Sequence, residues 1–174
     1  NIFLPDWYLA LDRKNKSKYL NTLPGIATLK AGIREILHRE GFRDFKFATV
    51  SYYSPHRNWQ GKTIEEIDKL RKNTTISTLD SQLDIFIEME SHGGAQMVYH
   101  NICPDIMKRI PKEEKNMIGT DSAIRYENTE SISHPRGWGT FPRFIKQFVR
   151  EDKLLSLDEA IYRMTGLPSQ VFKL

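Results

Sequence analysis

The sequence predicts an α/β fold that is rich in helices and has only a few short strands. Predicted helices and strands alternate irregularly along the chain, a pattern typical of α/β proteins. The strands are too few to close a barrel or to build a large sheet from these residues alone. With 174 residues, 39% hydrophobic and 28% charged, the chain matches one domain with a thin core. An α+β domain, in which helices cover a small sheet, is the alternative.

Helices are predicted where apolar residues recur with helical spacing between start and stop signals. Residues 23–41 give the clearest case, because apolar side chains from Leu29 to Leu37 share one face. Pro24 suits the first turn of this helix, and Gly41 suits its end. The other predicted helices cover residues 6–11, 63–70, 78–90, 104–110, 141–151 and 156–166.

Two of these helices begin with a capping box, the pattern S/T-x-x-E/Q. One box runs from Thr63 to Glu66 and the other from Ser156 to Glu159. In such a box each side chain satisfies a backbone N–H group that the first helical turn leaves without a partner. The two boxes therefore predict where these helices start.

Three strands are predicted, over residues 45–52, 95–99 and 116–121. The first is rich in β-forming residues that alternate between apolar and polar. The third is a short apolar segment that ends in the carboxylate of Asp121. A polar loop is predicted from there to about Gly139, before the helix over residues 141–151.

Composition excludes several classes of protein. The net charge of +4 is modest, and the basic residues form no stripe of the kind that nucleic-acid binders show. No apolar run reaches the ~20 residues that span a bilayer. The single Cys103 cannot form a disulfide within the chain, and the five His lack metal-ligand spacing. We therefore expect no nucleic-acid partner, no membrane span and no metal site made by this chain alone.

Two places are candidates for chemistry. Asp121 follows an apolar strand, and α/β folds build their sites at the carboxyl ends of strands; capping of the next turn is the structural alternative. The stretch His134-Pro135-Arg136-Gly137-Trp138-Gly139-Thr140-Phe141-Pro142-Arg143 is the second candidate. Its Arg136 or Arg143 could offer a planar fork to a carboxylate or phosphate. A rigid connector whose arginines bind backbone carbonyls is the alternative there.

These residues, taken in order, resemble the N-acyl-D-amino-acid deacylases (D-aminoacylases) of the amidohydrolase superfamily. The string from His134 to Arg143 is the most specific part of the resemblance. Weaker matches extend it over nearly the whole chain, at Pro5-Asp6-Trp7, Gly61-Lys62-Thr63-Ile64-Glu65-Glu66-Ile67, Met97-Val98-Tyr99-His100-Asn101, Asp105-Ile106-Met107-Lys108-Arg109-Ile110, Met117-Ile118-Gly119-Thr120-Asp121-Ser122 and the stretch from Val149 to Pro168.

The resemblance implies that the chain is the carboxyl-side fragment of a zinc-dependent (β/α)8 barrel. Residues 1–94 would then be the helical insertion after the seventh barrel strand. Residues 95–174 would hold the last barrel strand or strands, the substrate loop and the helices that follow. The apolar character of both chain ends also favours a fragment, because domains usually begin and end in polar segments.

The resemblance also assigns roles to residues. Asp121 matches the carboxylate that takes a proton from the attacking water and passes it to the leaving amine. Arg136 matches the clamp for the substrate carboxylate, and His134 is its expected companion in substrate binding. The zinc ligands of the family lie outside this chain. One departure stands out, because Ser122 occupies the place of a glycine that commonly follows the family's aspartate.

We therefore expect a fragment of an enzyme that hydrolyses the amide bond of N-acyl-D-amino acids. Its partners would be that small-molecule substrate and the missing N-terminal part of the barrel. The isolated fragment should be inactive, and a cytoplasmic location is favoured. The alternatives are a cyclic amidohydrolase similar to dihydroorotase or hydantoinase, and a non-catalytic α/β interaction module.

Overall fold

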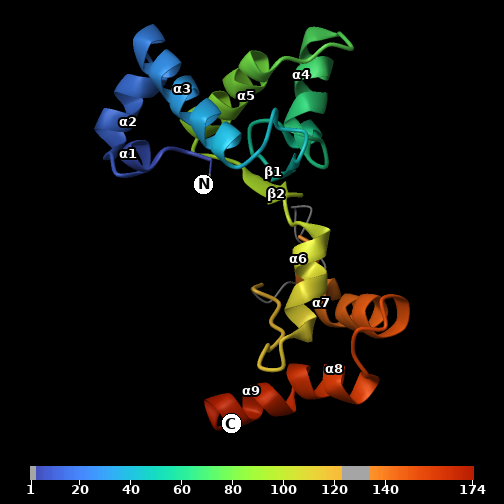
Figure 1. Ribbon diagram of the computed structural model, residues 1–174. Coiled ribbons are helices and arrows are strands. Elements are labelled where there is room, and N and C mark those ends of the chain that lie inside the picture. The colour runs from blue at the N-terminus through green and yellow to red at the C-terminus, as the bar shows by residue number, and fades with distance from the viewer. Residues whose placement is uncertain (1–2, 123–133) are drawn as a thin grey trace. The chain divides into compact units, whose positions relative to one another are not determined.

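The computed structural model describes residues 3–122 and 134–174, which divide into two compact units (Figure 1). The first unit is Asn1–His100 and the second is Asn101–Leu174. The units divide after residue 100, because the strand over residues 96–99 pairs with a strand of the first unit. The division predicted between residues 94 and 95 concerns regions of a larger barrel and is a separate matter. The assignment of the two parts to regions of a larger barrel stays a prediction.

The described helices of the first unit agree with the predicted ones, except that α2 was not predicted. Asp12 caps α2 by accepting a hydrogen bond from the Asn15 backbone at 2.8 Å. No residue of α2 is buried, which explains why apolar spacing did not reveal it. The helices are α1 (Asp6–Leu9), α2 (Arg13–Leu20), α3 (Leu23–Arg39), α4 (Ile64–Lys72) and α5 (Leu79–Ser91), with a 3-10 turn at Arg57–Trp59.

The predicted capping box at the start of α4 is confirmed. The Thr63 backbone donates to Glu66 Oε2 at 2.7 Å, and the Glu66 backbone donates to Thr63 Oγ1 at 3.2 Å. The bond from the Thr63 backbone, and a further one from Thr63 Oγ1 to Glu66 Oε2 at 3.0 Å, lower the pKa of the Glu66 carboxyl. Both orphan N–H groups are therefore satisfied at the position that the sequence indicates.

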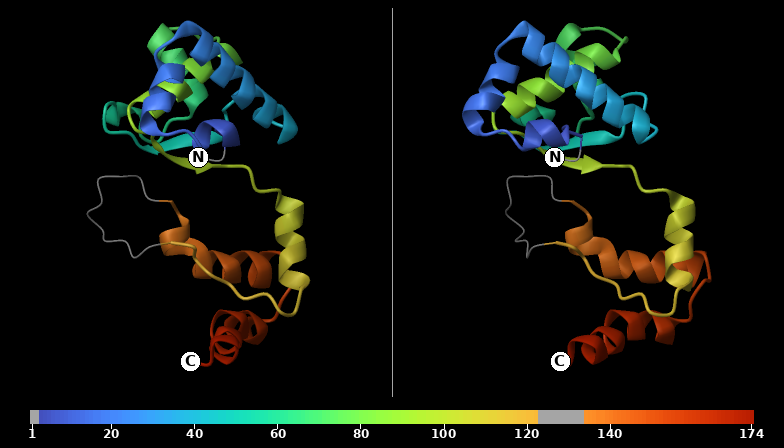
Figure 2. Two further views of the ribbon diagram at one scale, coloured as in Figure 1. Left: turned by 90° about the vertical axis from the view of Figure 1, so that its left-hand side faces the viewer. Right: turned by 60° about the vertical axis from the view of Figure 1, so that its left-hand side comes forward.

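The first two predicted strands are present, although both are shorter than predicted. β1 (Ala48–Tyr52) and β2 (Gln96–Tyr99) form an antiparallel two-stranded sheet, with Ala48 opposite Tyr99 and an irregularity between Val50 and Tyr52. Helices α3, α4 and α5 lie to one side of this sheet (Figure 2). A two-stranded sheet is marginal by itself, so packing against the helices is what stabilises it.

The core of the first unit is large and rich in aromatic side chains. Among the described residues, 19 buried apolar side chains form one cluster. Phe45 stacks on Phe86 with ring centroids 5.0 Å apart, and Phe3 meets Tyr99 edge to face at 5.2 Å. These rings join the amino-terminal segment, the sheet and α5 into a single core.

A buried polar network lies beside this core. The Asp68 side chain is only 1% exposed and accepts hydrogen bonds from Ser77 Oγ at 2.7 Å and Ser81 Oγ at 2.5 Å. Burial raises the pKa of Asp68, but the bonds from Ser77, Ser81 and Lys72 outweigh it and hold that pKa below its usual value. Buried Gln82 continues the network by accepting from the Phe45 backbone at 2.7 Å. The network links α4 and α5 to the chain that enters β1.

The second unit corrects two predictions about helices. The predicted polar loop up to about Gly139 is too long at its carboxyl end, because α7 already begins at Arg136, and residues 123–133 of that loop lie outside the described residues. The predicted capping box at Ser156 is only half formed, since Ser156 caps α8 while the Glu159 side chain binds Arg163 instead. The described elements are α6 (Pro104–Arg109), α7 (Arg136–Phe144), α8 (Leu157–Met164) and α9 (Gly166–Phe172), with a 3-10 turn at Ile110–Lys112 and a π-helical stretch at Ile145–Glu151.

The predicted strand over residues 116–121 is also wrong. This segment is extended but belongs to no sheet, because β1 and β2 pair with each other and no third strand is described for it to pair with. Its backbone is held instead by α8, through a bond from Ile118 N to the Arg163 carbonyl at 3.3 Å. A segment of this composition becomes a strand only beside a partner strand.

The core of the second unit is small. Its described buried apolar residues are Phe144, Phe148 and Ala160, and the two phenyl rings meet edge to face at 5.1 Å. Ile118 packs against this cluster and so anchors the extended segment. No described helix of either unit is long and apolar enough to cross a membrane.

Candidate active site

Asp121 and Arg136 lie together in the second unit, although 14 residues separate them in the sequence. Arg136 Nη1 donates to Asp121 Oδ2 at 3.0 Å. The extended segment runs up to the start of α7 (Figure 2), and there the hydrogen bond joins the two side chains. The Asp121 side chain is 91% exposed and the Arg136 side chain 45% exposed. An exposed ion pair contributes at most ~1 kcal/mol, so another carboxylate could replace Asp121 on the guanidinium.

The backbone of Asp121 is left-handed, with φ of +48°. Aspartate and asparagine adopt this conformation more readily than other residues that carry a Cβ. Ser122 is not among the described residues with positive φ, so the position where the resembled family has glycine needs no glycine here. Residues 123–133, which come next, lie outside the described part of the chain.

Arg136 is the first residue of α7, and His134 accepts hydrogen bonds from the first turn of this helix. The Arg136 backbone donates to His134 Nδ1 at 3.0 Å, and the Gly137 backbone donates to the His134 carbonyl at 3.2 Å. These bonds satisfy N–H groups that the first turn of a helix leaves without partners. His134 therefore orients the start of α7, while its expected contact with substrate stays a prediction.

Arg163 is a residue that the sequence analysis did not single out. It lies on α8, is 3% exposed, and donates from Nη1 to the carbonyls of Pro111 at 2.6 Å and Glu113 at 2.7 Å. Its Nε donates to Glu159 Oε1 at 2.7 Å. The i,i+4 spacing of Glu159 and Arg163 was the available signal, but such pairs usually lie on exposed helix faces.

The described residues hold no metal centre of their own. No group of three or more His, Cys, Asp or Glu side chains within residues 3–122 and 134–174 could bind an ion. Cys103 is exposed at the start of α6. Asp121 could offer a metal one carboxylate, so an ion at this place would need further ligands from elsewhere.

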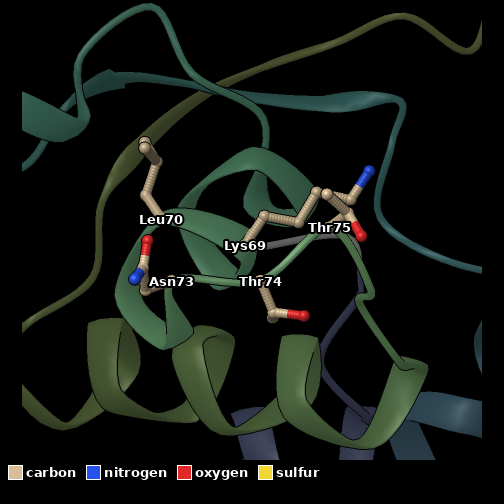
Figure 3. Close-up of a pocket in the computed structure, with 5 residues that line it drawn as sticks. All are labelled: Lys69, Leu70, Asn73, Thr74 and Thr75. Atoms are coloured by element: carbon tan, nitrogen blue, oxygen red, sulfur yellow. The ribbon is translucent and has the colours of Figure 1, made fainter.

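An open hollow lies in the first unit, at the carboxyl end of α4 (Figure 3). Its lining residues are Lys69, Leu70, Asn73, Thr74 and Thr75. The Lys69 ammonium is paired with Glu65 Oε1 at 2.8 Å. None of the predicted site residues lines this hollow.

The arrangement at Asp121 and Arg136 suits a small substrate that carries a carboxylate next to a polar bond. The guanidinium can bind a carboxylate through two parallel hydrogen bonds. The neighbouring Asp121 carboxylate can accept or donate a proton close by.

The comparisons with known proteins point to the same class. No family model matches the chain. It is similar to deacylases of N-acyl-D-amino acids, so the resemblance inferred from the sequence is confirmed.

Three curated relatives come from Alcaligenes xylosoxydans xylosoxydans. The chain is 36% identical to N-acyl-D-glutamate deacylase over 80 residues, 46% of this chain and 16% of that protein. It is 29% identical to D-aminoacylase over 125 residues, 72% of this chain and 23% of that protein. It is 51% identical to N-acyl-D-aspartate deacylase over 41 residues, 24% of this chain and 8% of that protein.

A solved structure of D-aminoacylase is similar as well, with a TM-score of 0.57 and 27% identity. The match covers 72% of this chain and 24% of that one, and the structure was studied for the role of its binuclear metal center. The chain thus spans less than a quarter of the length of each of these relatives.

Proposed function

We propose that this chain forms the substrate-carboxylate and proton-transfer part of an enzyme that hydrolyses N-acyl-D-amino acids. The observation that carries the proposal is the 3.0 Å contact between Arg136 and Asp121. In an N-acyl amino acid the carboxylate and the amide nitrogen are bonded to the same α-carbon. Two protein groups that serve them must therefore be neighbours, as these two side chains are.

In this proposal Arg136 binds the substrate carboxylate through its fork of N–H donors. Asp121 leaves the guanidinium, takes a proton from the attacking water and gives it to the leaving amine nitrogen. His134 holds the first turn of α7 and with it the Arg136 backbone. The fixed carboxylate then determines which face of the α-carbon, and so which enantiomer, meets the acid–base group.

Zinc is the metal we propose for the complete enzyme, with ligands from residues outside this chain. Its contribution would be the activation of water for attack. The two units would be the parts of a (β/α)8 barrel that follow its seventh strand. The chain by itself is then expected to be inactive, because the other parts of the barrel complete the site.

The test compares two substrates in the complete enzyme, an N-acyl-D-amino acid and the matching N-acyl amine without a carboxylate. Arg136→Ala should lower kcat/KM on the first by about 10²-fold or more, since charge-assisted hydrogen bonds contribute ~1.5–3 kcal/mol each. On the N-acyl amine the loss should be far smaller. Arg143→Ala is the matched control, because Arg143 is exposed on the same helix.

Equal losses on both substrates would show that Arg136 only supports the fold. A loss from Arg143→Ala in its place would move the clamp to Arg143. Asp121→Asn completes the test, and should lower turnover by about 10²–10⁴-fold with little change in KM. N-acyl derivatives of D-glutamate, D-aspartate and other D-amino acids would then define the side-chain preference. Turnover of cyclic amides alone would contradict the proposal.

A further inference from the structure

The Arg163 guanidinium is unusual because it is buried yet binds mostly backbone. A charged side chain that is 3% exposed needs partners for its N–H groups. Arg163 has one carboxylate, Glu159 Oε1, and two carbonyls, those of Pro111 and Glu113. Both carbonyls belong to a distant part of the chain, more than 45 residues earlier.

Those two carbonyls lie on the segment that leads to Asp121. From Glu113 to Asp121 the described backbone is neither helix nor strand, so no regular ladder holds it. At residues 111 and 113 the hydrogen bonds from Arg163 take the place of the backbone hydrogen bonds that a helix or sheet would supply. Its own carbonyl accepts from Ile118 N at 3.3 Å, which adds a third attachment three residues before Asp121.

Apolar packing adds to these hydrogen bonds. The Ile118 side chain packs on the Phe144, Phe148 and Ala160 cluster, and Ala160 lies on α8 one turn before Arg163. The segment is therefore fixed to α8 through polar bonds on one side and through apolar packing on the other. The Asp121 side chain is exposed, and its only described side-chain partner is Arg136, so this upstream attachment fixes the backbone from which it projects.

We propose that Arg163 is a positioning residue for Asp121, which it holds in place through the backbone of residues 111–118. The inference rests on the proposed function, in which Asp121 transfers the proton. Displacement of a reacting group by about 1 Å can lower a rate by ~10²-fold. Loss of the Arg163 bonds should therefore lower turnover although Arg163 touches no substrate.

The experiment uses Arg163→Gln in the complete enzyme, with steady-state kinetics and amide hydrogen exchange. We expect kcat to fall about 10–100-fold and KM to change less than about threefold, because Arg136 on α7 is left in place. The loss should be equal on an N-acyl-D-amino acid and on the N-acyl amine, unlike that of Arg136→Ala. Exchange should speed up at Ile118 and its neighbours.

Two further variants keep the test decisive. Glu159→Gln is the matched control, because its amide oxygen can still accept from Arg163 Nε and both carbonyl bonds remain; its kcat should stay within about threefold of the wild type. Arg163→Lys retains the charge with a single donor nitrogen, and its kcat should be intermediate. If Arg163→Gln fails to fold, kcat and amide exchange of Arg163→Lys test the proposal in its place.

A folded Arg163 variant with faster exchange at residues 113–118 and wild-type kcat would overturn the inference. So would a folded variant with unchanged exchange there. Failure of the proposed function looks different, because Asp121→Asn would then keep its turnover. If Asp121→Asn is inactive and the Arg163 variants are fully active, only the role of Arg163 is wrong.

Discussion

The two units differ in how they are held together. Within the described residues, the first unit buries 19 apolar side chains in one cluster and the second unit buries three. The second unit also carries 12 of the 17 exposed large apolar side chains, among them Trp138 on α7 and Phe172 on α9. The candidate active site lies in this second unit. Packing thus stabilises one unit, while the other keeps its functional side chains open.

Polar bonds show the same division. In the first unit Asp68 and Gln82 form a buried network between elements that already pack together. In the second unit Arg163 holds a segment without regular structure. A small core leaves fewer apolar contacts to fix such a segment, so directional hydrogen bonds do that instead.

Separation of the units should give the largest effect. Residues 1–100 alone are expected to melt in one cooperative transition, since their core is complete within that range. Residues 101–174 alone are expected to show no cooperative transition, because three buried apolar residues give too little hydrophobic stabilisation. Calorimetry and near-UV circular dichroism of the two fragments would measure this. A sharp melting transition for residues 101–174 would contradict the comparison.

Removal of one phenyl ring from each core should destabilise the first unit more than the second. Phe45→Ala should lower the free energy of unfolding of the first unit by about 3–5 kcal/mol, and Phe148→Ala should lower that of the second by less than about 2 kcal/mol. The second value is smaller because the small cluster can collapse around the gap. Urea unfolding followed at Trp59 and at Trp138 in single-tryptophan proteins separates the units. Equal losses would mean that the second core is larger than its buried residues indicate.

The Asp68 network should make the first unit sensitive to acid. The pKa of folded Asp68 lies below its ordinary value, so its contribution is complete above about pH 5 and is lost as the pH falls through that pKa. Asp68→Asn should cost about 1–3 kcal/mol at pH 7 and should remove this part of the acid dependence. Urea unfolding from pH 7 to pH 3 would measure both. Parallel curves for the two proteins would argue against the network.

Removal of a helix cap should give the smallest effect, and again a larger one in the first unit. Thr63→Ala removes the Thr63 hydroxyl, which accepts from Glu66 N and donates to Glu66 Oε2, and should cost about 1–2 kcal/mol. Ser156→Ala breaks a single bond, that from Glu159 N, and should cost about 0.5–1 kcal/mol. Thermal unfolding of both variants tests the order, with Ser169→Ala on α9 as a control that caps no helix. If Ser156→Ala destabilised the protein more than Thr63→Ala, a complete capping box would be worth no more here than a single cap.

Much of the first unit could be predicted because its signals are local. Thr63 and Glu66 form their box within four residues, and the apolar face of α3 can be counted along the chain. α2 could not be found from apolar spacing, because it buries no side chain. Asp12 before it was the one local signal for a helix start.

The second unit was harder to predict because its structure depends on distant contacts. Gly137, Gly139 and Pro142 disfavour a helix, yet α7 runs through them with His134 at its start. The segment before Asp121 has the composition of a strand, and its hydrogen bonds go to α8 instead. No spacing argument brings Asp121 next to Arg136. The resemblance named both residues, and only the fold shows their contact.

The left-handed backbone at Asp121 limits what evolution or an engineer can place there. Glycine would fit the conformation but brings no acid, and glutamate would bring an acid on a residue type that rarely takes this conformation. Aspartate combines the two properties, and asparagine copies its shape without its proton chemistry. Position 121 should therefore tolerate almost no functional replacement, and asparagine is the variant that separates chemistry from conformation.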